Sequence, residues 1–79
     1  MCNLEKYDEI FVDVFSIEEK NLNENIVRGA VKDWDSLGHV KLITTIEDVF
    51  NIMFDTEDIL EFDSYDKGKE ILKKYNITV

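Results

Sequence analysis

Apolar side chains recur at steps of three or four residues in the middle of the chain, at Leu37, Val40, Ile43, Ile46, Phe50 and Met53. This spacing is that of one face of an α-helix, and the chain contains no proline that would interrupt it. The apolar stripe is widened by Leu42, Val49 and Ile52. We therefore predict a helix from about Ser36 to Ile52, and we expect it to be the most buried helix of the protein.

Three further segments have the pattern of helices. The first, from about Asn3 to Ile17, has an apolar stripe formed by Leu4, Tyr7, Ile10, Phe11, Val14 and Phe15. A short helix is predicted within residues 55–61, where acids in the first turn complement the helix dipole, and a last one within 64–75. Residues 21–33 lack a sustained period, and we expect their scattered aliphatic side chains to hold a long connection against the core. The prediction is an all-α, four-helix fold with a long first loop and a short third helix, in a single domain over residues 1–79.

Acidic side chains dominate the charge of the chain. Eighteen acids against nine bases give a net charge of -9, which repels nucleic acid and anionic membranes and attracts basic protein surfaces. No lysine or arginine occurs from residue 42 to residue 66, where the acids are Glu47, Asp48, Asp55, Glu57, Asp58, Glu61, Asp63 and Asp66. So small a domain has little room for an enclosed catalytic cavity. These features favour a binding or carrier protein that is not an enzyme.

The ends and the cysteine content indicate a cytoplasmic protein. Cys2 is the only cysteine, so no internal disulfide is possible, and we expect a free thiol on a frayed terminus. The first residues lack the basic and apolar regions of a signal peptide, and no stretch approaches the ~20 apolar residues of a membrane span. We expect a monomer in the cytoplasm, without nucleic-acid or membrane partners.

Two helix-capping residues stand where the central helix is predicted to begin. The side-chain oxygen of Asp35 or of Ser36 can accept a hydrogen bond from a backbone N–H of the first turn, and the sequence leaves open which of them is the cap. A serine at this boundary lies beside the positive end of the helix dipole, where a phosphate group on its hydroxyl would be stabilised. Capping alone is one interpretation, and a modification site at Ser36 is the other.

The wider segment favours the second interpretation. It reads Trp34-Asp35-Ser36-Leu37-Gly38-His39. This segment resembles the phosphopantetheine attachment motif of acyl carrier proteins, and the resemblance extends over nearly the whole order of predicted helices. It implies a four-helix bundle of the acyl-carrier type, whose serine receives a 4′-phosphopantetheine arm from a separate phosphopantetheinyl transferase. The arm's thiol would carry acyl groups as thioesters for acyl-loading and acyl-processing enzymes with basic docking surfaces.

The resemblance assigns roles to particular residues of this chain. Ser36 would be the attachment site, with Asp35 and Leu37 as the other cofactor-binding residues, and Asp35 would help present the site to the transferase. The partner-docking surface would consist of Leu37, Val40, Thr44, Glu47 and Asp48. Carriers of fatty-acid synthesis usually have acids where this chain has Gly38 and Lys41, so we expect a dedicated carrier in a specialised fatty-acid, polyketide or related pathway. The alternatives are a peptidyl or aminoacyl carrier, and an acidic helical interaction module that carries no prosthetic group.

Two other chemistries are disfavoured by the residues. A serine hydrolase would need an orienting group and an oxyanion site beside Ser36 and His39, and we expect His39, the only histidine, on a solvent-exposed face.

Trp34 is expected to be an apolar anchor for the helix that follows it.

A calcium loop of the EF-hand type is the other chemistry. Asp33, Asp35 and Gly38 match its first, third and sixth positions, but Leu37 and Thr44 stand where oxygen ligands are required. No metal site is predicted.

Overall fold

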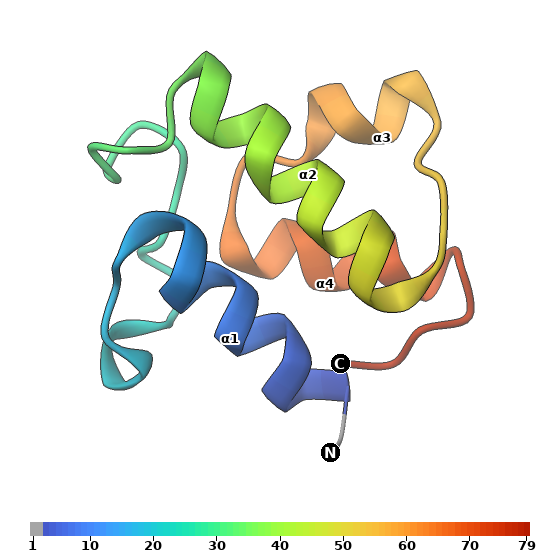
Figure 1. Cartoon of the computed structure of the whole chain (residues 1–79), viewed down its shortest axis with the longest axis horizontal. Helices are drawn as coiled ribbons and strands as arrows, with labels where there is room; N and C mark the ends of the chain where they lie inside the picture. The colour runs from blue at the N-terminus through green and yellow to red at the C-terminus, as the bar shows by residue number, and fades with distance from the viewer. Residues whose placement is uncertain (1–2) are drawn as a thin grey trace.

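Four α-helices occupy most of residues 3–79, which are the residues that the computed structural model describes (Figure 1). They are α1 (Asn3–Phe15), α2 (Ser36–Phe50), α3 (Thr56–Glu61) and α4 (Tyr65–Lys73), with the 3-10 helix η1 (Glu19–Asn21) in the connection between α1 and α2. The predicted all-α class, long first loop and short third helix are confirmed for this part of the chain. The radius of gyration is 11.3 Å, close to the ~11.6 Å of a compact chain of this length. The prediction of a free Cys2 thiol lies outside the described residues.

Two helices end earlier than the apolar pattern predicts, and left-handed backbone explains both ends. α1 ends at Phe15 because Ser16 adopts a φ of 55°. α2 ends at Phe50 because Asn51 is left-handed, with its N–H bonded to the carbonyl of Glu47. Asparagine tolerates this conformation better than most residues and often ends helices. The chain therefore turns away from α2 before Ile52, which is half-buried outside the helix.

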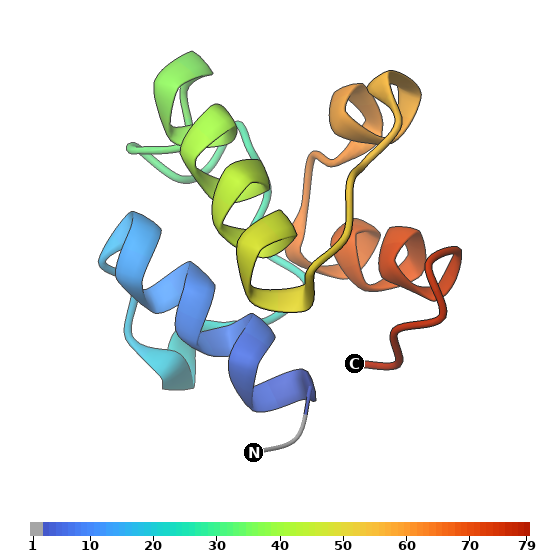
Figure 2. The same cartoon turned by 45° about the vertical axis from the view of Figure 1, so that its right-hand side comes forward.

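The core lies between the helices and is largely aromatic. α1 and α2 lie side by side in both views, and α4 lies below α2 in the view of Figure 1 (Figures 1 and 2). The largest fully buried side chains are Tyr7, Phe11, Phe62, Leu42, Ile46, Ile71 and Leu72. The ring of Phe11 is at the centre, with its centroid 5.7 Å from that of Trp34 and 5.3 Å from that of Tyr65. Edge-to-face pairs such as these add to the burial of apolar surface.

The side chains of Tyr7 and Phe62 pack directly against α4 because residue 68 is glycine. A Cβ built on Gly68 would lie 2.2 Å from the hydroxyl oxygen of Tyr7 and 2.3 Å from Cζ of Phe62. The Tyr7 hydroxyl donates a hydrogen bond of 2.6 Å to the backbone carbonyl of Tyr65, and burial raises the pKa of Tyr7 far above its ordinary value. The weak helix propensity of Gly68 is thus offset by tight packing.

The long connection from α1 to α2 is attached to the start of α4. Val27 forms an isolated antiparallel bridge with Ser64, and hydrogen bonds of 2.8 Å run from Arg28 N to Asp63 O and from Tyr65 N to Ile26 O. The aliphatic residues of the connection that pack against the core are Leu22, Ile26 and Val31. The expectation that aliphatic side chains hold this connection in place is confirmed.

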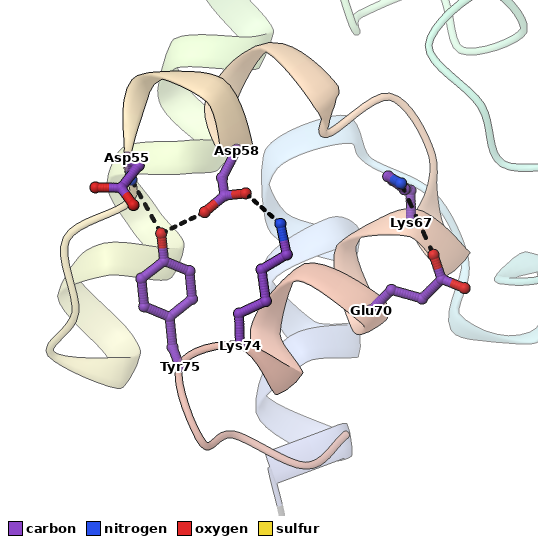
Figure 3. A network of polar contacts seen from close by, with 6 residues as sticks. All are labelled: Asp55, Asp58, Lys67, Glu70, Lys74 and Tyr75. Atoms are coloured by element: carbon purple, nitrogen blue, oxygen red, sulfur yellow. Dashed lines mark hydrogen bonds and ion pairs between the residues drawn. The ribbon is translucent and has the colours of Figure 1, made fainter.

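α3 is fastened to the end of α4 by a buried carboxylate (Figure 3). Asp58 is only 5% exposed, and it accepts hydrogen bonds from the Tyr75 hydroxyl at 2.6 Å and from Lys74 Nζ at 3.0 Å. The Tyr75 oxygen in turn accepts a bond from the backbone N–H of Asp55 at 3.0 Å. The bond from Tyr75, followed by that from Lys74, lowers the pKa of Asp58 below its ordinary value of 3.8, against the opposing effect of burial. The pair of Lys67 and Glu70 on α4 in the same view, at 3.9 Å, is solvent-exposed and contributes little.

α2 is not the most buried helix, contrary to the prediction. It buries four side chains, the same number as the shorter α1. Apolar side chains that the sequence pattern placed on its buried stripe are exposed, at Leu37, Val40 and Val49. The helix presents more apolar residues than one core-facing stripe can accommodate, and the remainder face solvent. No helix in the described part of the chain combines the length and apolar character that crossing a membrane requires.

Candidate functional site

Asp35 is the N-cap of α2, which answers the question that the sequence leaves open. Its backbone is extended, with φ -100° and ψ -165°, and its Oδ1 accepts a hydrogen bond of 2.9 Å from Gly38 N. The Asp35 carbonyl accepts the first backbone bond of the helix, from His39 N at 2.8 Å. Ser36 is therefore the first helical residue, and its hydroxyl is not needed for capping.

The Ser36 side chain is exposed at the positive end of the α2 dipole. None of the hydrogen bonds between described residues involves its hydroxyl. The next residue, Leu37, is 83% exposed, and Val40, one turn further on, is 62% exposed. The hydroxyl is therefore accessible to a large partner, and apolar side chains flank it.

Gly38 allows the preceding connection to lie directly against the first turn of α2. A Cβ at this position would be 2.0 Å from the backbone oxygen of Asp33 and 3.3 Å from Cε1 of Phe15. Real Cβ atoms do not come this close to a backbone oxygen, so only glycine fits without movement of the chain. The contact fixes the connection relative to the residue that carries the exposed hydroxyl.

His39 is buried, so the prediction that it lies on a solvent-exposed face is wrong. The ring is 6% exposed, and its Nδ1 lies 3.0 Å from Nε1 of Trp34. Indole nitrogen only donates, so Nδ1 is the acceptor and the proton is on Nε2, which donates to the carbonyl of Ile59 at 2.7 Å. His39 thus links the connection, α2 and α3 through two hydrogen bonds. Neither ring nitrogen is available as a base for Ser36, and no serine–histidine pair forms.

The burial of His39 could have been predicted from its spacing to other residues of the sequence. His39 stands three, four and seven residues before Leu42, Ile43 and Ile46, which are the buried residues of α2. Trp34, expected as an apolar anchor, is 2% exposed and packs on Phe15 with ring centroids 5.0 Å apart. The anchor role of Trp34 is confirmed, and its N–H supplies the partner that lets the histidine be buried.

The residues predicted to form a docking surface are not equivalent in the structure. Val40, Thr44 and Asp48 are exposed on α2, together with Leu37. Glu47 is half-buried, and its Oε2 accepts a hydrogen bond of 2.9 Å from the backbone N–H of Phe54. Glu47 therefore stabilises the turn after α2 instead of facing solvent freely.

α3 adds an exposed apolar residue that sequence reasoning missed. Leu60 is 73% exposed, next to Ile59, whose carbonyl is bonded to His39 near the start of α2. Fewer carboxylates in this region are free to contact a partner than the sequence suggests, because Asp58 and Glu47 are engaged in internal hydrogen bonds. The exposed side of α2 is thus a mixture of apolar and acidic side chains.

The residues that resemble an EF-hand loop serve other purposes. The carboxylate of Asp35 caps α2, and the carbonyl of Asp33 packs against Gly38. Among residues 3–79, no group of three or more histidine, cysteine, aspartate or glutamate side chains lies in a position to hold a metal ion.

Neither the known protein-family models nor the curated protein sequences include a match to this chain.

Proposed function

We propose that the protein is an acyl carrier protein of the four-helix type, which works only after Ser36 has received a 4′-phosphopantetheine arm. The observation that carries the proposal is the exposed, uncommitted hydroxyl of Ser36 at the first residue of α2, beside the exposed apolar side chains of Leu37 and Val40. Asp35 performs the capping, so modification of Ser36 does not remove a helix-stabilising bond.

The modification is a phosphoryl transfer that a separate transferase catalyses with Mg²⁺. Ser36 Oγ attacks the β-phosphorus of coenzyme A and loses its proton to a base of the transferase. A new phosphorus–Oγ bond forms, and the bond from that phosphorus to the oxygen of the adenosine 3′,5′-bisphosphate leaving group breaks. The positive end of the α2 dipole favours the resulting phosphodiester anion. When bound, the arm supplies a thiol that holds acyl groups as thioesters.

Recognition by enzymes would use the exposed side of α2. Leu37 and Val40 supply apolar contacts close to Ser36, while Thr44 and Asp48 supply polar and acidic contacts one and two turns further on. Charge attraction of this kind speeds encounter with basic partners more than it raises affinity, as a carrier that exchanges partners requires. Lys41 is exposed within the same region, which supports enzymes of a specialised pathway over those of general fatty-acid synthesis.

The test is an intact mass measurement after incubation with coenzyme A, Mg²⁺ and a broad-specificity phosphopantetheinyl transferase. The parent protein should gain one phosphopantetheine, and Ser36→Ala should gain none. Thr78→Ala is the matched control, since Thr78 is also an exposed hydroxyl residue but stands outside the motif, and it should be modified like the parent. A folded parent that gains no mass with several transferases would contradict the proposal and favour the interaction module.

The docking surface has a separate test. Val40→Asp places a charge among the apolar contacts and should slow modification by about tenfold, equivalent to the ~1.4 kcal/mol of a moderate interface contact. Thr78→Asp adds the same charge at an exposed position near the C-terminus and should leave the rate unchanged. Equal rates for the two variants would exclude Val40 from the docking surface. Transfer assays with fatty acyl and aminoacyl donors would then distinguish an acyl carrier from a peptidyl or aminoacyl carrier.

A further inference from the structure

A groove lies between the end of α1 and the connection that leads to α2. Its volume is about 450 Å³, within the ~300–1,000 Å³ typical of small-molecule sites. Its apolar lining comes from Phe15 and Ile17 at the end of α1 and just after it, and from Ile26 and Val31 of the connection. All four residues also belong to the core or pack against it, so the walls of the groove are part of the folded structure.

The groove is close to the attachment serine. Asp33 lines it and precedes Ser36 by three residues, so the two Cα atoms are at most ~11 Å apart. The contact between the Asp33 carbonyl and Gly38 holds this wall against the first turn of α2. A phosphopantetheine arm on Ser36, when extended, spans a longer distance than this.

Polar side chains line the groove beside the apolar ones. Asn21 and Ser16 are both among the residues that line it. None of the side-chain hydrogen bonds between described residues involves either of these two side chains. A carboxamide donates and accepts, so it can pair with either polar atom of an amide in a ligand.

We infer that this groove receives the pantetheine part of the arm carried by Ser36, an inference that rests on the proposed function. The geminal dimethyl group contacts the apolar wall of Ile26 and Val31, and the amides of the arm bond to Asn21 and Ser16. Attachment at Ser36 makes this binding intramolecular, so a shallow groove suffices because the local concentration of the arm is high. In this state the arm lies against the carrier and the thiol is held close to its surface.

The experiment uses full-length protein labelled with ¹³C and ¹⁵N, modified with unlabelled coenzyme A and the transferase. Isotope-filtered nuclear Overhauser spectra then detect contacts between the unlabelled arm and the labelled protein. We expect contacts from the dimethyl and methylene protons of the arm to the methyl groups of Ile17, Ile26 and Val31. Contacts only to Leu37, Val40 or Leu60, or no contacts in a modified sample, would overturn the inference.

Two variants distinguish binding of the arm in the groove from attachment of the arm to Ser36. Ala30→Phe fills the groove, which Ala30 lines, and should weaken the contacts at least fivefold while the mass gain stays complete. Glu24→Phe places the same side chain at an exposed position of the connection outside the groove and should leave the contacts unchanged. Undiminished contacts in Ala30→Phe would overturn the inference. Absence of a mass gain in the parent overturns the proposed function, whereas a mass gain without contacts overturns only the groove.

Discussion

Replacement of Gly38 by alanine tests whether the close contact at the start of α2 is essential to the fold. The new Cβ would lie 2.0 Å from the backbone oxygen of Asp33 and 3.1 Å from its carbonyl carbon. A carbon and a carbonyl oxygen normally remain about 3.3 Å apart or more, so one of the two segments must move by more than ~1 Å. The segment cannot move freely, because Trp34, the next residue, is buried in the core.

The magnitude follows from two opposing effects. Alanine in place of glycine gains up to about 1 kcal/mol of helix propensity, and Gly38 is in the first turn, where the gain is smaller than in the interior. Overpacking of a closely packed site costs about 1–3 kcal/mol, and a contact this short with backbone is at the upper end. We expect Gly38→Ala to lower the free energy of unfolding by about 2 kcal/mol, or the melting temperature by about 10 °C for a chain of this size.

Urea unfolding at neutral pH, followed by circular dichroism, measures this difference. Gly29→Ala is the matched control, because no atom lies within 4 Å of a Cβ at that position and its φ is not positive. We expect Gly29→Ala to be neutral or to stabilise by up to ~1 kcal/mol. A Gly38→Ala variant as stable as the parent would refute the steric reasoning, because helix propensity would then outweigh the contact.

Three further predictions concern the hydrogen bonds of the fold. The lowered pKa of Asp58 means that its ionised form contributes stability above pH 3.8, and this stability is lost as the pH falls through the folded-state pKa. Asp58→Asn should therefore cost about 1.5–3 kcal/mol of unfolding free energy at pH 7 and flatten its dependence on pH in urea titrations from pH 7 to pH 3. An unchanged loss of stability at acid pH in this variant would contradict the prediction. His39→Phe should cost about 1–3 kcal/mol in thermal unfolding because it leaves the buried N–H of Trp34 unpaired, whereas a neutral effect would show that the bond is dispensable. Asp35→Ala should lose about 1 kcal/mol of capping while Ser36→Ala stays within ~0.5 kcal/mol, and calorimetry showing the reverse order would make Ser36 the cap.

The helices could be predicted because their signals are local. Apolar spacing placed α1, α2 and α4, acids in the first turn placed α3, and the polar residues before α2 and α4 marked their starts. Their ends were less accurate, since the apolar pattern continues past Phe15 and Phe50 while the backbone turns left-handed at Ser16 and Asn51. Side-chain periodicity does not report such a change of backbone conformation.

The candidate site could be predicted in part. The position of Ser36 at the start of α2 followed from the capping pattern, but the choice of Asp35 as the cap depended on backbone geometry that brings its Oδ1 to Gly38 N. The exposure of Leu60 and the bond from Glu47 to Phe54 both depend on how the turn after α2 and the helix α3 pack. No local pattern contains that information.

The sequence by itself determined the helical class, the order and approximate limits of the helices, and the serine at the head of α2, because each depends on residues within a few turns of one another. Only the tertiary structure decided which partners the buried polar side chains have. His39 can be buried because it forms hydrogen bonds with Trp34 and with the carbonyl of Ile59. Asp58 can be buried because it accepts hydrogen bonds from Tyr75 and Lys74. A polar group is buried at low cost only where such partners meet it, and those partners are far away along the chain or belong to elements whose packing the local sequence does not specify.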